Sequence, residues 1–138
     1  MFGLHLSRMG FIGIDRSAGA SALKTLVRAA RKVHADGQDI IMFPEGTRTP
    51  PGKRQPYQPG IAAVYRELGV QVIPVALNSG VFWGRRKLIK QPGNIIVQFL
   101  PPIQPGLQRY DFMAELENRI ETATNLLVKD ATNKLSPE

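Results

Sequence analysis

The sequence predicts a single α/β domain in which helices flank a mixed, mostly parallel sheet, and three observations support this fold class. Short apolar runs typical of buried strands alternate with segments whose apolar residues recur at helical spacing. Gly and Pro residues punctuate the junctions between these segments. A length of 138 residues fits one domain, and a hydrophobic content of 43% supports a folded core. The expected element order is β-α-β-α-β-β-α, with residues 1–138 in one domain.

The first strand is predicted over residues 11–14, and an amphipathic helix follows at about 21–35. The apolar residues of this helix recur at helical spacing, at Leu23, Leu26, Val27, Ala30 and Val33. Gly37 is a suitable stop, because glycine adopts the left-handed conformation that ends many helices. The apolar run at 40–43 then predicts a buried strand, which stops at Pro44 because proline cannot donate to a sheet ladder.

A loop rich in Pro, Gly and charge is predicted over residues 49–59. It leads into a short helix at 61–68 that Gly69 closes. The longest β-like run follows at 70–77. Pro74 lies in its middle, so this strand is expected at a sheet edge or with a bulge.

Residues 78–93 are predicted as a loop and 95–100 as a further strand, which Pro101-Pro102 ends. Asp111 is predicted as the N-cap of a last helix. Its apolar residues are Phe112, Met113, Leu116, Ile120, Ala123 and Leu127. Residues 129–138 are expected to form a frayed tail.

The chain is basic, with a formal net charge of +7 that is unevenly distributed. Residues 1–110 contain 15 Lys and Arg against 5 Asp and Glu, whereas residues 111–138 contain 3 against 6. A basic body suits anionic partners such as nucleic acid, phosphorylated metabolites or acidic lipid headgroups. Aromatic residues make up only 7%, and the sequence has no nucleic-acid-binding motif, so we expect no nucleic-acid partner. The lack of cysteine excludes disulfides within this chain, and no apolar stretch is long enough for a membrane span.

The candidate functional site is the segment Phe43–Thr49, which places a carboxylate, a hydroxyl and a guanidinium within four positions at the end of a predicted strand. Open α/β sheets bind their ligands at such strand ends, and Gly46 permits backbone angles closed to other residues. Arg48 offers a planar fork of donors for a phosphate, which the hydroxyl of Thr47 and nearby backbone N–H groups can share. The alternative is a turn in which Glu45 and Arg48 pair only with each other.

Three ordered blocks of the sequence resemble those of the glycerolipid acyltransferases, the family of 1-acylglycerol-3-phosphate acyltransferases. Phe43–Arg48 resembles the family signature, Phe-Pro-Glu-Gly-Thr-Arg. Gly10–Arg16 resembles the block ahead of the signature, and Val72–Gly80 the block behind it. The resemblance implies an enzyme that moves a fatty acyl group from acyl-CoA or acyl carrier protein to the free hydroxyl of lysophosphatidate, in phospholipid biosynthesis. It implies no metal or other cofactor.

The resemblance also implies which residues bind the lysophospholipid or glycerol phosphate. The implied substrate-binding residues are Arg16, Glu45, Gly46, Thr47 and Arg48. Arg16 and Arg48 would contact the phosphate, and Glu45 would hold the glycerol hydroxyls or orient an arginine. The chain departs from the family pattern at Pro59, where many members have a basic residue, so one positive contact is missing.

The catalytic element of the family, a His followed after four residues by an Asp, lies some tens of residues ahead of the Asp-Arg block. Here His5 is followed at that interval by Gly10. His34 and Asp39 have the right interval but lie between the Asp-Arg block and the signature. We therefore expect an N-terminally truncated acyltransferase part that has no catalytic residue of its own and is inactive alone. The alternative is a non-catalytic module that binds glycerophosphates or membrane surfaces.

The segment 82–90 combines the bulky apolar residues Phe82 and Trp83 with four positive charges. The alternatives are a solvated loop and a contact with an anionic membrane surface, with both aromatic rings at the level of the headgroups. The expected location is the cytoplasmic side of a membrane, with the chain peripheral or anchored through other sequence.

Overall fold

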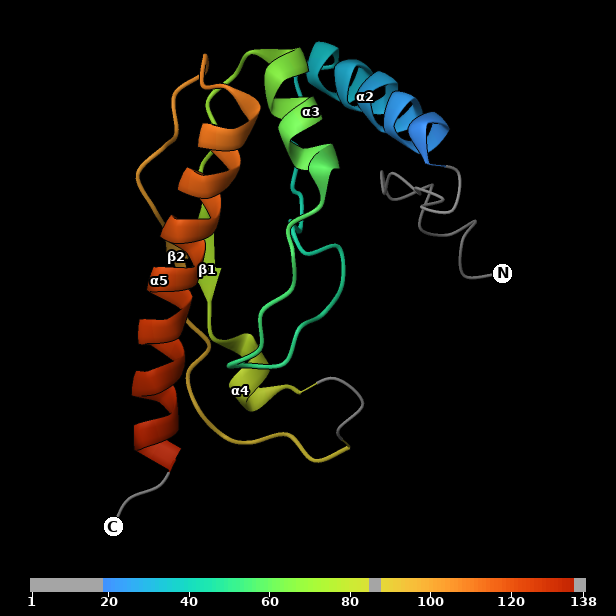
Figure 1. Cartoon of the computed structure of the whole chain (residues 1–138). Coiled ribbons are helices and arrows are strands. Elements are labelled where there is room, and N and C mark those ends of the chain that lie inside the picture. The colour runs from blue at the N-terminus through green and yellow to red at the C-terminus, as the bar shows by residue number, and fades with distance from the viewer. Residues whose placement is uncertain (1–18, 85–87, 136–138) are drawn as a thin grey trace.

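The computed structural model describes residues 19–84 and 88–135, and Figure 1 shows how they are arranged. The elements in chain order are α2 (Ala20–Ala35), α3 (Pro59–Leu68), β1 (Val75–Leu77), α4 (Ser79–Phe82), β2 (Val97–Phe99) and α5 (Arg109–Leu135). Helices and a small sheet occur together, which confirms the mixed α/β character of the prediction. The strand predicted over 11–14 lies outside the described residues.

The helices α2 and α3 pack against each other and confirm two predictions made from local sequence. Leu26 and Ala30 of α2 are buried together with Val64 of α3. Helix α3 begins at Pro59, whose fixed φ suits the first helical turn. It ends at Gly69, which adopts a left-handed φ of 61°.

The sheet differs from the prediction, because the described residues form two strands that run antiparallel. Val75 lies opposite Phe99, and Leu77 lies opposite Val97. A parallel pair needs a long crossover connection, usually a helix that packs on the sheet. In the described part of the connection over 78–96 the one helical element is the single turn α4, and the chain returns antiparallel to β1. The prediction of a mostly parallel sheet is therefore wrong for the described residues.

Two predicted strands are lost or shortened for separate physical reasons. The segment 40–43 is no strand, since no described segment pairs with its backbone, and Ile41 and Phe43 are 85% and 73% exposed. The predicted strand 70–77 is interrupted at Pro74, which has no N–H to donate. Only its last three residues form β1, while residue 72 makes an isolated antiparallel bridge with residue 103.

The last helix, α5, is longer at both ends than the sequence predicts. It begins at Arg109, so Asp111 lies in its first turn and is not the N-cap. An acidic residue there still interacts favourably with the positive end of the helix dipole. The helix continues to Leu135 through the residues predicted as a frayed tail, and Ala131 in this extension is buried.

The main core lies where α3 and α5 meet near one end of the sheet (Figure 1). The rings of Tyr65 on α3 and Phe112 on α5 stack with centroids 3.8 Å apart. The hydroxyl of Tyr65 donates to the carbonyl of Gln104 at 2.6 Å and accepts from the N–H of Leu107 at 3.0 Å. This core fixes the start of α5 against α3. None of the helices in the described ranges has the length and apolarity needed to cross a bilayer.

Candidate functional site

The signature segment forms a tight turn whose side chains differ in exposure. The N–H of Gly46 donates to the carbonyl of Phe43 at 2.9 Å, and Gly46 has a φ of 64°, which favours glycine. Thr47 and Arg48 are exposed, whereas Glu45 is half-buried. Among the described residues, Glu45 and Arg48 make no ion pair with each other, so the simple paired turn is not what forms. Arg48 is left facing solvent.

A backbone hydrogen bond closes the loop that follows the turn. The N–H of Gln58 donates to the carbonyl of Pro44 at 2.7 Å, which brings the two ends of the 44–58 loop together. Pro59, the position that departs from the family pattern, is the first residue of α3. The closure therefore places Tyr57 next to the signature turn.

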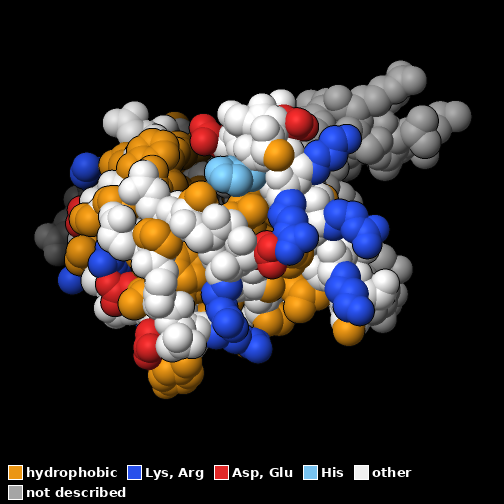
Figure 2. Space-filling model, turned by 90° about the horizontal axis from the view of Figure 1, so that it is seen from above, with side chains coloured by type: hydrophobic (Ala, Val, Ile, Leu, Met, Phe, Trp, Pro, Cys, Tyr) orange, Lys and Arg blue, Asp and Glu red, His pale blue; other side chains and the backbone are white. Residues whose placement is uncertain are grey.

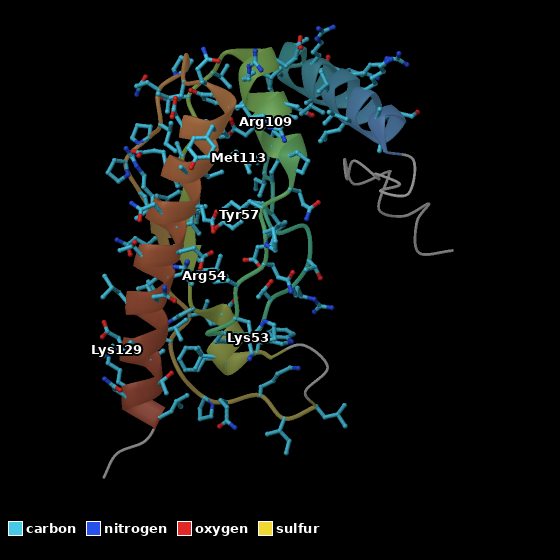
Figure 3. All side chains as sticks on the ribbon, viewed as in Figure 1. Lys53, Arg54, Tyr57, Arg109, Met113 and Lys129 are labelled. Atoms are coloured by element: carbon cyan, nitrogen blue, oxygen red, sulfur yellow. The ribbon has the colours of Figure 1, made fainter. Side chains whose placement is uncertain are left out.

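The side chain of Tyr57 joins this loop to α5. Tyr57 is buried, and its hydroxyl donates to Oε1 of Glu121 at 3.0 Å. Nε of Arg54 lies 4.0 Å from Oε2 of the same carboxylate. Figure 3 shows Arg54 and Tyr57 reaching from the loop toward α5. The sequence did not predict the contact between Tyr57 and Glu121, because 64 residues separate them.

The environment of Glu45 disfavours its charge. Burial is the larger of two causes that raise the pKa of the Glu45 carboxyl, and the negative charge of Glu121 is the smaller one. Oε2 of Glu45 is buried and has no hydrogen-bond partner among the described residues, and neither has Oγ1 of Thr49. Two buried oxygens without partners can accept hydrogen bonds from a ligand that carries hydroxyl groups.

Tyr57 is held in its neutral form by the same surroundings. Burial raises the pKa of its phenol most, followed by the hydrogen bond to Glu121 and the negative charges of Glu121, Glu45 and Glu117. The phenol therefore remains a hydrogen-bond donor at every physiological pH. A cavity of about 490 Å³ lies beside it, between the loop and α5, with Met113 and Glu117 on the helix side.

The third block of the predicted site meets the loop through a glycine. A Cβ at Gly80 would lie 3.1 Å from Cγ of Pro51, so α4 approaches the 44–58 loop closely. Asn78 is buried and holds the segment before β2: its Oδ1 accepts from the N–H of Ile96 at 2.8 Å, and its Nδ2 donates to the carbonyl of Asn94 at 3.3 Å. These contacts give the third block a structural role.

The predicted histidine and arginine sites have different outcomes. His34 is exposed on α2, as predicted, and Asp39 is exposed as well. Within the described ranges the two residues make no hydrogen bond or ion pair with each other. Arg16 lies outside the described residues, so its predicted contact with the same phosphate as Arg48 stays a prediction. The described residues also contain no group of three His, Asp or Glu side chains placed to hold a metal.

Basic side chains collect on α2 and the neighbouring helix. Figure 2 shows Lys and Arg gathered on one part of the face seen from above. A groove of about 580 Å³ lies between α2 and α3, with Lys24, Arg28, Arg31 and Arg66 on its walls. Arg31 forms an ion pair with Glu67 across the two helices. This groove shares no lining residue with the cavity beside Tyr57.

The segment predicted to contact a membrane is only partly as expected. Trp83 is 63% exposed, Leu88 and Ile89 are also exposed, and Nζ of Lys90 lies 4.8 Å from the centre of the Trp83 ring. Phe82, however, is buried, so the prediction that its ring reaches the headgroups is wrong. Residues 85–87 lie outside the described residues.

Comparisons with known proteins agree with the signature. The family model described as Acyltransferase matches residues 1–78. The chain is 34% identical over 120 residues to a 1-acyl-sn-glycerol-3-phosphate acyltransferase of Pseudomonas aeruginosa, covering 87% of this chain and 47% of the relative. It is 32% identical over 93 residues to an enzyme of the same name from Limnanthes alba, covering 67% of this chain and 33% of the relative. The chain thus spans half or less of the length of these relatives, and no solved structure matches it.

Proposed function

This chain belongs to the acyltransferase family, and from that premise we propose that it supplies the acceptor-binding part of a 1-acylglycerol-3-phosphate acyltransferase. The complete reaction would move a fatty acyl group from acyl-CoA or acyl carrier protein to the free hydroxyl of lysophosphatidate. The observation that carries the proposal is the signature turn, in which Arg48 and Thr47 are exposed and Glu45 is half-buried.

The exposed and half-buried side chains of the turn suit the two chemical parts of the acceptor. Arg48 makes no ion pair among the described residues, and its guanidinium can form charge-assisted hydrogen bonds to a phosphate, which are shorter and stronger than neutral ones. The N–H groups and hydroxyl of the turn add further donors near Thr47. Glu45 and Thr49 hold buried oxygens that find no hydrogen-bond partner in the described part of the chain, and such oxygens suit the hydroxyl groups of glycerol. Arg16 would complete the phosphate contact from the block ahead of the signature.

In the reaction, the acceptor hydroxyl oxygen attacks the thioester carbonyl carbon, the C–S bond breaks, and the thiol carrier leaves. A general base must take the hydroxyl proton, and the resemblance assigns that step to a His-Asp pair ahead of the Asp-Arg block. The residues described here would bind and orient the acceptor, which is the proximity part of catalysis. This division of labour is consistent with His34 and Asp39 being exposed and unpaired with each other.

A binding experiment with glycerol 3-phosphate tests the proposal. Replacing Arg48 by Gln removes its charge-assisted hydrogen bonds, which are worth about 1.5–3 kcal/mol, so the Kd should rise by roughly tenfold or more. Arg66→Gln is the matched control, because Arg66 is an exposed arginine on α3 outside the turn. Calorimetric titration of the three proteins measures the effect. Equal affinity in all three would contradict the assignment of the turn.

A second candidate function is a peripheral module that binds an anionic membrane surface, and the exposed side chains of Trp83, Leu88 and Ile89 favour it. Apolar rings and chains of this kind insert at the headgroup level, while nearby cations attract acidic lipids at about 1 kcal/mol each. In this second candidate function the chain would be peripheral to the membrane, and we propose that it lies on the cytoplasmic side.

Sedimentation with vesicles tests the membrane contact. Binding to vesicles that contain phosphatidylserine should weaken in high salt, because salt screens surface charge, and should weaken again in Trp83→Ser. Tyr110→Ser is the control, because it removes an exposed aromatic ring on α5. Equal binding to neutral and acidic vesicles would contradict the electrostatic part, and full binding of Trp83→Ser would contradict the aromatic part.

A further inference from the structure

We propose that Tyr57 and Glu121 are positioning residues for Glu45, so that α5 sets the position and the charge of the signature carboxylate. The inference rests on the proposed function, because it concerns the same acceptor site. It adds to that site two residues that lie outside the three resembling blocks, one in the loop and one on the last helix.

The geometry connects the three side chains through a closed loop. The hydrogen bond from Gln58 N–H to the Pro44 carbonyl at 2.7 Å holds the two ends of the loop together, with Glu45 next to one end and Tyr57 next to the other. The hydroxyl of Tyr57 then donates to Glu121 at 3.0 Å. The loop is therefore fastened to α5 within one residue of its closure. Any displacement of this contact moves the turn that carries Glu45.

Among the described residues, the charged and titratable groups near Glu45 come from α5 and from the 44–58 loop. On α5, Glu121 raises the pKa of Glu45, while Glu117 acts on Tyr57. On the loop, Tyr57 contributes a neutral donor, and Arg54 lies 4.0 Å from Glu121 with most of its side chain exposed. Because an exposed cation is well solvated, Arg54 offsets the charge of Glu121 only weakly. Glu121 therefore remains an effective negative neighbour of Glu45.

This arrangement predicts how acceptor binding depends on pH. An ionised Glu45 accepts hydrogen bonds from a hydroxyl group on both oxygens, whereas a protonated one has lost part of that capacity. Binding should therefore strengthen as the pH rises through the pKa of Glu45, which Glu121 holds above its usual value. Removing the charge of Glu121 lowers the pKa of Glu45, so the same rise in affinity should occur at lower pH.

The experiment uses the 138-residue chain and two readouts. The first is the titration midpoint of the Glu45 side-chain carboxyl carbon, measured by NMR without ligand. The second is the Kd for glycerol 3-phosphate across the same pH range. In Glu121→Gln both the midpoint and the affinity rise should move to lower pH. Glu117→Gln is the matched control: it removes the same charge one helical turn away and should leave the Glu45 midpoint at its wild-type position.

A second variant keeps the test decisive if Glu121→Gln does not fold. Tyr57→Phe removes the hydrogen bond that fastens the loop to Glu121, so Glu45 is held less firmly near that carboxylate and its midpoint should move in the same direction by a smaller amount. An unchanged midpoint in the folded variants would overturn the positioning role. A shifted midpoint in a chain that binds no glycerol 3-phosphate would instead contradict the proposed function while confirming the coupling between Glu45 and Glu121.

Discussion

At the scale of single residues, the proposed function of Glu45 and the stability of the fold oppose each other. Its buried Oε2 has no hydrogen-bond partner among the described residues, and the negative charge of Glu121 on α5 raises its pKa further. Such an arrangement costs folding free energy, because a charge is removed from water without full compensation. Residues at functional sites often carry such a cost, and replacing them commonly stabilises the protein while reducing activity.

We expect Glu45→Gln to raise the melting temperature at neutral pH. The pKa of Glu45 is raised above 4.5 in the folded chain, so the folded state binds its proton more tightly than the unfolded state does. Stability from this group is therefore fully present below the unfolded pKa and is lost as the pH rises through the folded pKa. Glutamine resembles the protonated form at every pH. Thermal unfolding should show an advantage for the variant at pH 7 that disappears near pH 4, and a variant that is less stable at pH 7 would contradict the sign.

At the scale of elements, the helices α2 and α3 could be predicted from the sequence, whereas the sheet and the single turn α4, in a segment predicted as a loop, could not. Helical spacing, a first-turn proline and a terminal glycine are local signals, and they located α2 and α3 within two residues of their observed bounds. Strands depend on a partner elsewhere in the chain. The apolar run at 40–43 satisfied every local criterion and is still no strand, because no described segment pairs with it.

The site likewise has one part that follows from local sequence and another that depends on a distant partner. The binding role of Arg48 stays a prediction, whereas the turn at Pro44 and Gly46 could be predicted because its chemistry is local. Its contact with Glu121 depends on how α5 packs, and that packing joins residues 64 positions apart. The one signal available was a carboxylate that directly follows Ile120, a residue of the apolar stripe of the helix. Nothing in the sequence paired that carboxylate with Tyr57.

The contact between α3 and α5 is the element-scale interaction that can be tested most directly. Phe112 is fully buried and stacks on Tyr65 at 3.8 Å. Phe112→Ala should lower the free energy of unfolding by about 3–5 kcal/mol, through lost burial and the cavity left behind. Tyr110→Ala is the control, because this aromatic residue in the first turn of the same helix is 82% exposed. Denaturant unfolding measures both, and equal losses would show that the stacked pair is not the main contact.

At the scale of the whole molecule, charge and apolar surface are both unevenly distributed. The net negative segment 111–138 lies almost entirely on α5. Basic side chains instead collect on α2 and along its groove with α3. Apolar side chains remain exposed on the sheet, with Val97 at 55% and Phe99 at 73%. An exposed strand edge with apolar neighbours is available for pairing with another strand. The described residues therefore contain a formed signature turn, and they expose apolar and basic surfaces that have no partner within them.

Activity is the property that tests the whole molecule. We expect the 138-residue chain to bind glycerol 3-phosphate but to transfer acyl groups from acyl-CoA at no rate above background. The reason is that no described His-Asp pair supplies a positioned general base, whose proton transfer contributes roughly 10²–10⁴-fold. His34 is exposed and unpaired with Asp39, so His34→Ala should change nothing. A form extended upstream by a His-x4-Asp block should transfer acyl groups, and there Glu45→Ala or Arg48→Ala should depress the rate strongly. The acyl-transfer rate of each protein is measured from the thiol released by acyl-CoA. Rapid transfer by the 138-residue chain that is lost in His34→Ala would instead make His34 and Asp39 the catalytic pair.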